Sequence, residues 1–442
     1  MRPGLETSRA LLAELGNPHE GLKYIHVAGT NGKGATCAIL DSVLRAAGYT
    51  TGRYTSPHLV SISERFFLNG APMPRVMLDA AADTVFPAVE KLERERGMEV
   101  TFFECLTAIA FVLFKRSSPD VIILETGLGG RLDATNVIRG EDLLASVITR
   151  IGLDHCDWLG TTHAAIAEEK AGIIKPGRPV IAAPMPPAAR ETIARIASLN
   201  GSAFVDAEEC VSFKGARPLQ ITTAMRNLPP VEFALFGGFQ IENAMTAVAT
   251  LDVLERSCGM NIHDFAVVRG LETVVWPGRC QKVEYEGVTF VIDGAHNPCG
   301  AMALKESIRY AKLPEPVAII AGFCGDKDVL AHLRTMSAIA TTGWAVPIRN
   351  ARTLDSQTVA ERMHMAGFTR TKACANLDEA LASAVAWAHD TWGTVVICGS
   401  LFLAAEALVK LKAFPWPYEH EDQNELSIHD GEGAPGGSKE GR

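Results

Sequence analysis

The residues most able to do chemistry lie in a glycine-rich segment near the N-terminus, within Gly29-Thr-Asn-Gly-Lys-Gly34. An apolar run over 24–28 precedes this segment and a helical pattern over 36–47 follows it. A strand, a glycine loop and a helix N-terminus form a phosphate cradle, because backbone N–H groups and the helix dipole attract an anion. Lys33 adds a full positive charge. We therefore predict nucleotide phosphate contacts for Gly29, Thr30, Asn31, Gly32, Lys33 and Gly34.

The strict P-loop pattern fails in this segment, because Val27 stands five residues before Gly32 and Gly34 follows Lys33 where serine or threonine is usual. Taken alone, the segment also fits a tight strand–helix turn with a surface lysine. Three further polar loops argue against that alternative, since each follows a predicted strand and such loops meet at one sheet edge. These loops span 54–58, 124–131 and 151–155.

Several side chains in these loops are candidates for metal binding. Glu125 ends an apolar strand, where its carboxylate could hold Mg²⁺ on ATP phosphates, although a capping or ion-paired acid is the alternative. His155 follows Asp154 at another strand end, which favours a ligand or orienting role over a structural one. Ser56 offers a hydroxyl in a turn, and by itself is no better than a turn residue. Lys170 alone reads as a solvated helix lysine near two glutamates.

Strands and helices alternate along the first part of the chain. This alternation predicts an α/β fold with a mainly parallel sheet covered on both faces, and ligands beyond the carboxyl ends of its strands. The predicted strands are 24–28, 49–54, 120–125, 145–149, 179–183 and 203–206, and the predicted helices are 7–15, 36–47, 78–96, 102–116, 162–173, 187–199 and 241–257.

The alternation breaks at Trp276-Pro-Gly-Arg279 and then restarts. We predict a P-loop-type ATPase domain over 1–278, a smaller Rossmann-like α/β domain over 279–414, and an acidic, disordered tail over 415–442. The second set of predicted strands is 288–293, 316–322, 343–348 and 393–398, and the predicted helices are 298–312, 328–340, 355–366, 376–389 and one from about 401.

Composition narrows the class of protein. The 442 residues include 42 basic and 51 acidic side chains, a net charge of −9 with no basic stripe, which argues against a nucleic-acid partner. Ten cysteines are scattered singly, which argues against a disulfide framework or a zinc cluster and favours a reducing cytoplasm. The longest apolar stretches, 106–114 and 317–323, are too short to span a bilayer. We therefore expect a cytoplasmic protein without a membrane partner.

The motifs together resemble the folylpolyglutamate synthase/dihydrofolate synthase family of the Mur ligase superfamily. The extra Gly34 after Lys33 distinguishes this family from the cell-wall Mur ligases. The resemblance covers nearly the whole body of the chain, and its motifs lie at 15–18, 26–34, 55–58, 64–65, 101–104, 125–136, 152–155, 169–175, 276–279, 293–298 and 326–328.

This resemblance implies an ATP-dependent acid–amino-acid ligase that uses ATP and Mg²⁺. Its γ-phosphoryl group passes to a carboxylate of a pteroate or folate, and L-glutamate then attacks the acyl phosphate. The implied substrates are dihydropteroate or tetrahydrofolate and L-glutamate, and the implied state is a monomer. The sequence leaves open whether the enzyme makes dihydrofolate, extends folate polyglutamates, or does both.

The resemblance also assigns roles to single residues. Lys33, His155 and Lys170 are the implied catalytic residues. Reaction of Lys170 with CO₂ to give a metal-binding carbamate needs a neutral amine, so its pKa must fall from the reference of about 10.4. The implied metal ligands are Ser56, Glu125, His155 and carbamylated Lys170; Gln240 and Asn243 would contact adenine, Arg279, Asp293 and His296 would close over the nucleotide, and Ser400 would contact glutamate.

Two residues depart from the family pattern. Ala35 stands where the family usually has serine or threonine, and Phe239 stands where a histidine commonly precedes the adenine-site glutamine. Two alternative functions remain: a superfamily ligase acting on another carboxylate, and a nucleotide switch or binding module without ligase activity. A GTPase switch should carry an Asn-Lys-x-Asp motif, which this sequence lacks.

Overall fold

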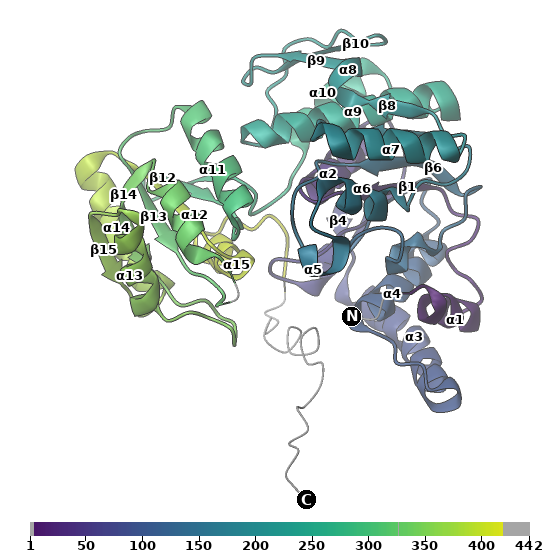
Figure 1. The fold of residues 1–442 in the computed structure, drawn as a ribbon, viewed down its shortest axis with the longest axis horizontal. Helices are drawn as coiled ribbons and strands as arrows, with labels where there is room; N and C mark the ends of the chain where they lie inside the picture. The colour runs from purple at the N-terminus through teal and green to yellow at the C-terminus, as the bar shows by residue number, and fades with distance from the viewer. Residues whose placement is uncertain (1–3, 326, 419–442) are drawn as a thin grey trace, which may run out of the picture.

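The computed structural model describes residues 4–325 and 327–418, and these form two large sheets with helices on both faces and a separate two-stranded sheet (Figure 1). The first sheet has eight strands in the order β4-β3-β2-β5-β1-β6-β7-β8. Its first two strands form an antiparallel edge, and the remaining six are parallel to one another. The strands are β1 (Tyr24–Ala28), β2 (Thr51–Tyr54), β3 (Phe66–Leu68), β4 (Ala71–Pro72), β5 (Val121–Glu125), β6 (Leu143–Ile148), β7 (Val180–Ala182) and β8 (Phe204–Asp206).

The central strands of this sheet are apolar throughout because both of their faces are covered. Ile25 and Val27 of β1 pack into the cluster formed with α2 (Lys33–Ala46), α9 (Gly238–Cys258) and α10 (Asp264–Thr273). Tyr24 points to the opposite cluster, formed with α1 (Glu6–Glu14), α3 (Arg75–Arg96) and α4 (Phe102–Ser117). Near the β7 side of the sheet, α6 (His163–Ala171) packs against α7 (Pro187–Leu199).

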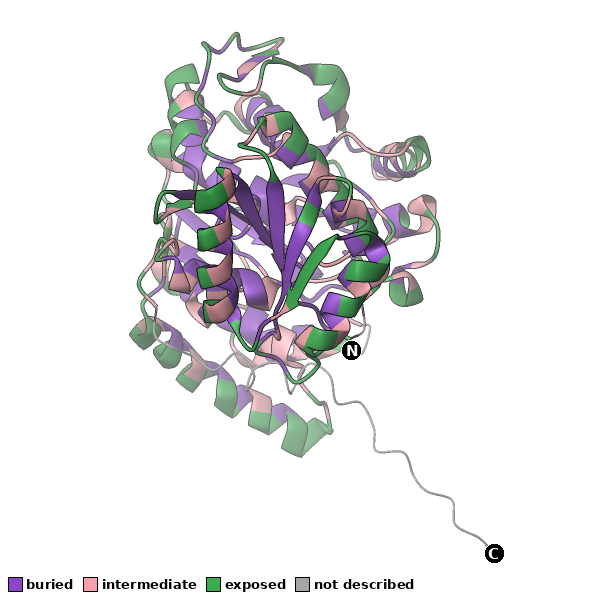
Figure 2. Ribbon diagram, turned by 90° about the vertical axis from the view of Figure 1, so that its left-hand side faces the viewer, coloured by how far each residue is buried: buried purple, intermediate pink, exposed green. Residues whose placement is uncertain are grey.

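The second sheet has six strands in the order β11-β12-β16-β13-β14-β15, all parallel except the edge strand β11. Figure 2 views this part of the molecule and shows buried strands between helices whose outer faces are exposed. The elements are β11 (Gln281–Tyr285), β12 (Val288–Ile292), α11 (Pro298–Ala311), β13 (Val317–Ala321), α12 (Val329–Met336), β14 (Ala340–Ala345), α13 (Ser356–Ala366), β15 (Arg370–Ala373), α14 (Leu377–Thr391), β16 (Thr394–Cys398) and α15 (Leu401–Lys410).

The predicted α/β class with mainly parallel sheets is confirmed, but several short elements were missed. Helix α2 begins at Lys33 rather than at residue 36, and the strand predicted over 343–348 lies at 340–345. The missed elements are β3, β4, the 3₁₀ turns Ile62–Arg65 and Ala134–Val137, α5 (Cys156–Leu159), α8 (Ala207–Cys210), β9 (Val211–Lys214), β10 (Gln220–Thr223), α10, β11 and β15. The missed strands have two to five residues, too few to display a clear period of two, and the missed 3₁₀ turns and the helices α5 and α8 have four residues each, too few to display a helical period. The ten-residue helix α10 was missed despite its length.

The division at residue 279 stays a prediction, with the first sheet ending at Asp206 and the second beginning at Gln281. Of the tail predicted over 415–442, residues 419–442 lie outside the described residues, as does Asp326. Residues 415–418 are described, and they include aromatic rings in contact with other parts of the chain. No helix in the described ranges is long and apolar enough to cross a membrane.

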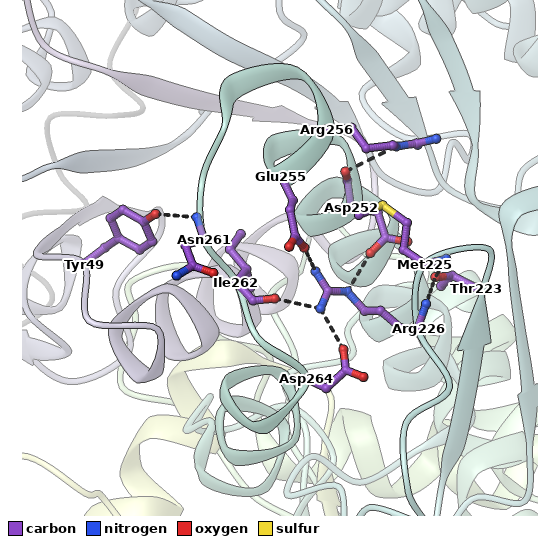
Figure 3. A network of polar contacts seen from close by, with 10 residues as sticks. All are labelled: Tyr49, Thr223, Met225, Arg226, Asp252, Glu255, Arg256, Asn261, Ile262 and Asp264. Atoms are coloured by element: carbon purple, nitrogen blue, oxygen red, sulfur yellow. Dashed lines mark hydrogen bonds and ion pairs between the residues drawn. The ribbon is translucent and has the colours of Figure 1, made fainter.

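A buried arginine ties the β9–β10 region to α9 and α10 (Figure 3). The side chain of Arg226 is 3% exposed. Its guanidinium donates to Asp252 Oδ1 (2.6 Å), Asp264 Oδ1 (2.9 Å), the carbonyl of Ile262 (2.7 Å) and Glu255. Carboxylates from α9 and α10 thus converge on one cation, which fixes the helix that carries Gln240 at its other end.

Candidate active site

The glycine segment and α2 have the geometry of a phosphate cradle. Gly32 has φ 91°, and a Cβ atom there would lie 2.1 Å from Asn243 Oδ1, so only glycine fits this turn without strain. The helix begins at the next residue, Lys33. The first backbone N–H groups of a helix have no intrahelical partner, and they therefore remain free to bind an anion.

The loop after β6 holds the glycine segment in place. The N–H groups of Thr30 and Asn31 donate to the carbonyl of Arg150 at 3.0 and 3.2 Å. The Thr30 hydroxyl donates to the carbonyl of Gly152 at 3.1 Å, and the N–H of Gly152 donates back to that hydroxyl at 3.1 Å. The cradle and the loop leading to His155 therefore form one rigid unit.

A small cavity of about 60 Å³ brings the three predicted catalytic residues together. Lys33, His155 and Lys170 all line it, and His155 is at the start of α5. The remaining lining residues are Gly29, Thr30, Gly127, Leu128, Asp154 and Leu159.

Lys170 is the buried member of this group. Its side chain comes from α6, is only 3% exposed, and donates through Nζ to the carbonyl of Gly29 at 2.9 Å. Burial, aided by the nearby charge of Lys33, lowers the pKa of Lys170 to about 7. A substantial share of this amine is thus neutral at physiological pH, the form that can act as a nucleophile.

Glu125 lies at the end of β5 and connects the cavity to Ser56. One carboxylate oxygen accepts from the backbone N–H of Ser56 at 3.0 Å, and the other lies 4.0 Å from Lys33 Nζ. Burial raises the pKa of Glu125, and the charge of Lys33 opposes this rise. Among the described residues, no three His, Cys, Asp or Glu side chains are grouped closely enough to hold a metal by themselves. The carboxylate of Glu125 nevertheless fits Mg²⁺, which commonly binds one or two carboxylates together with substrate phosphates and water.

Gln240 and Asn243 lie beside the cradle at the start of α9. Asn243 Nδ2 donates to Gln240 Oε1 at 2.9 Å, and Asn243 Oδ1 approaches Gly32 as described above. Gln240 is fully buried, and its Nε2 has no hydrogen-bond partner within the described part of the chain. The neighbouring Phe239 packs instead against the core cluster of the second sheet.

Arg279 lies at the junction just before β11, and Asp293 and His296 lie in the loop between β12 and α11. Asp293 accepts from the N–H groups of Cys280 and Ala295, both at 2.7 Å, and burial raises its pKa against the opposing charge of Arg279. Burial lowers the pKa of His296, and the carboxylate of Asp154 opposes this shift. Burial raises the pKa of Glu125, and the charge of Arg279, like that of Lys33, opposes this rise. Charged groups of the first sheet region and of the junction and second sheet region therefore influence one another's pKa values.

Known proteins resemble this chain along most of its length. Residues 278–401 match the family model of the Mur ligase, glutamate ligase domain. A Bacillus subtilis (strain 168) relative, dihydrofolate synthase/folylpolyglutamate synthase, is 35% identical over 347 residues, 77% of this chain and 80% of the relative. The chain belongs to the folylpolyglutamate synthase/dihydrofolate synthase family. It is therefore an ATP-dependent ligase.

Two solved structures support the same membership. A Mycobacterium tuberculosis folylpolyglutamate synthase complexed with ADP and AMPPCP has a TM-score of 0.85 and 29% identity, covering 94% of this chain and 96% of that one. E. coli FolC in complex with DHPP and ADP has a TM-score of 0.81 and 31% identity, covering 93% and 94%. The resemblance predicted from the motifs is thus confirmed for the family, the fold and the enzyme class.

Ser400 is not among the residues that line this cavity. Its hydroxyl accepts from the N–H of Phe402 at 3.1 Å, and the residue, 4% exposed, caps α15. Conversely, sequence reasoning assigned no role to four cavity residues: Gly127, Leu128, Asp154 and Leu159. The feature of the sequence that could have identified them is that their loops follow predicted strands.

Asn136 is a further residue that the sequence analysis left without a role. Its Nδ2 donates to the carbonyls of Arg131 and Gly172, both at 3.0 Å. The N–H of Arg131 donates to the carbonyl of Glu169 at 2.8 Å. The segment after β5 is therefore fastened to the end of α6 that carries Lys170.

Proposed function

We propose that this protein uses ATP to join L-glutamate to a carboxylate of a pteroate or folate. The observation that carries this proposal is the cavity in which Lys33, His155 and the buried amine of Lys170 meet beneath the glycine loop. Glu125 lies 4.0 Å from Lys33, and Arg279 from the junction acts on the same carboxylate. Family membership supplies the reaction class to which this arrangement is suited.

The proposed chemistry has two steps. A carboxylate oxygen of the pterin substrate attacks the γ-phosphorus of ATP, and the bond to the β-phosphate oxygen breaks to release ADP. The amine of glutamate then attacks the acyl carbon and loses a proton, and inorganic phosphate leaves with the bonding electrons. Phosphoryl transfer depends mainly on positioning and charge neutralisation, which the cradle and Lys33 provide.

The remaining roles follow the motif assignments. Ser56, Glu125 and His155 would hold Mg²⁺, which when bound would neutralise phosphate charge. The neutral amine of Lys170 would add to CO₂, forming an N–C bond and losing a proton, to give a carbamate as a further metal ligand. Gln240 and Asn243 would contact adenine, and Arg279, Asp293 and His296 would close over the nucleotide.

Ser400 would contact glutamate from the start of α15, next to Gly399, whose N–H donates to the carbonyl of Ala295 at 2.8 Å. The acceptor is proposed to be dihydropteroate, tetrahydrofolate or both, since the Bacillus subtilis relative carries both names. We further propose that the enzyme is cytoplasmic, which its scattered single cysteines favour, and that it acts as a monomer.

A side-by-side acceptor assay tests the proposal. Purified protein with ATP, Mg²⁺ and glutamate receives dihydropteroate, tetrahydrofolate or no acceptor, and phosphate release is followed with product mass. We expect phosphate release to require both glutamate and a pterin, with a mass gain of one glutamate. Equal phosphate release without a pterin would favour a nucleotide hydrolase instead.

A further inference from the structure

The residues after α15 run from the second sheet region back toward the first. We call residues 411–418 the C-terminal strap; it is the last described part of the chain and appears in yellow between the two sheets in Figure 1. Leu411 is buried in the apolar cluster that residues of β12, β16, α14 and α15 form on one face of the second sheet, and Phe414 packs against the same cluster. Gln281 of β11 donates through Nε2 to the carbonyl of Ala413 at 3.0 Å. The strap is thus anchored at its beginning in the second sheet region.

Trp416 carries the strap onto the first sheet. Its ring lies 4.9 Å from the ring of Phe67 on β3, with an interplanar angle of 74°, an edge-to-face arrangement. Phe67 is only 1% exposed. The ring of Phe414 also contacts Trp416, with ring centroids 5.6 Å apart.

The flanking residues restrict the strap to an extended path. Pro415 and Pro417 enclose Trp416. Each proline fixes its own φ, and each also confines the residue before it to extended conformations. Little conformational entropy is therefore lost when Trp416 is placed against Phe67. A disordered tail, by contrast, would not hold a tryptophan in a fixed position against a buried ring.

Phe67 in turn supports a buried arginine. The Arg53 Cζ atom lies 3.8 Å from the centre of the Phe67 ring and 5.6 Å from that of Trp276. Arg53 is 2% exposed; its Nη1 donates to Asp41 Oδ2 at 3.4 Å, while its Nε has no hydrogen-bond partner in the described ranges. A buried cation with so few polar contacts depends on the aromatic faces around it.

The last member of the stack touches the nucleotide loop. A Cβ atom on Gly34 would lie 2.2 Å from Cζ2 of Trp276, so the indole lies directly against the first turn of α2. Gly34 follows Lys33, whose ammonium lines the cavity. Trp416, Phe67, Arg53 and Trp276 therefore form a continuous series of ring and cation contacts that ends at the phosphate cradle.

We propose that Trp416 is a positioning residue for nucleotide binding, acting through Phe67, Arg53 and Trp276 on Gly34. The strap also ties the second sheet region to the first, so docking of the two regions adds this support to the phosphate cradle. This inference rests on the proposed function only in that the ligand is ATP or ADP.

Nucleotide binding by truncated and substituted chains tests the proposal. A chain ending at residue 413 and Trp416→Ala both remove the ring, whereas a chain ending at residue 418 keeps the strap. Trp392→Ala is a matched control because that tryptophan is 84% exposed. The affinity for ADP is measured by calorimetry well below each variant's unfolding temperature, and KM for ATP and kcat are measured where ligation occurs.

We expect the chain ending at 413 and Trp416→Ala to bind ADP about three- to tenfold more weakly. The chain ending at 418 and Trp392→Ala should match the full chain, and Trp416→Phe should largely restore affinity, which a purely structural loss would not explain. Unchanged ADP affinity in both ring-deleted variants, with the full chain binding ADP, would overturn this proposal alone. A full chain that binds no ADP would overturn the proposed function, and this proposal with it.

Discussion

Lys170 combines burial with a lowered pKa, and both are needed for reaction with CO₂. We expect Lys170→Ala to abolish ligation, and Lys170→Arg to fail to restore it, because a guanidinium stays charged and forms no carbamate. Steady-state ligation assays measure this. Lys115→Arg is the control, because Lys115 is an exposed lysine that donates to the carbonyl of Glu20 and does not line the cavity. Full activity in either Lys170 variant would exclude the carbamate role.

The pH dependence of this lysine follows from its pKa of about 7. With ¹³C-bicarbonate, a carbamate NMR signal on Lys170 should rise through neutral pH, because the neutral fraction grows there. Between pH 7 and the ordinary value of 10.5, the unfolded chain binds more protons at this site than the native chain does. The contribution of Lys170 to stability should therefore increase with pH across that window. A signal that appears only in strongly alkaline solution would contradict the lowered pKa.

Asn136 positions the end of α6, so its amide should matter for catalysis more than for stability. Asn136→Asp keeps the shape but removes both N–H donors to Arg131 and Gly172. We expect kcat to fall about tenfold or more, because small displacements of a catalytic group are costly. Asn200→Asp is the control, since Asn200 makes a similar bond to Ile196 on α7 away from the cavity. Equal kcat values in the two variants would remove Asn136 from this role.

At the scale of elements, the sequence predicted the long, periodic segments and missed the short ones. Strands such as 24–28 and 120–125 stand out because they are apolar on both faces and precede glycine turns. Strands β9 and β15 have largely exposed side chains, and so they leave no apolar pattern. Lys33, His155 and Lys170 were found through their motifs, whereas the contact between Trp416 and Phe67 joins positions far apart in the chain and gives no local signal.

The Arg226 cluster should dominate the stability of the α9–α10 region. Arg226→Met would leave the carboxylates of Asp252, Glu255 and Asp264 without their shared cation. We expect the free energy of unfolding to fall by about 3 kcal/mol, because removing one partner of a buried ion pair is strongly destabilising. Urea denaturation measures the change. Arg94→Met, at an exposed pair with Glu95, should change stability by less than about 0.5 kcal/mol. A similar loss in both variants would contradict the clamp.

At the scale of the whole molecule, the phosphate cradle belongs to the first sheet, while Arg279, Asp293 and His296 approach from the junction and the second. Family membership explains why a nucleotide loop and a second α/β unit occur in one chain, because ligation must bring an activated carboxylate to an amine. The predicted boundary at residue 279 lies between the last strand of one sheet and the first strand of the other.

Acceptor-dependent phosphate release decides whether this chain joins glutamate to a pteroate or folate. We expect the full chain with ATP, Mg²⁺ and glutamate to release phosphate only when dihydropteroate or tetrahydrofolate is present, one phosphate for each glutamate joined. Phosphate release that is independent of both pterins, or ligation of glutamate to an unrelated carboxylate in their place, would contradict this expectation.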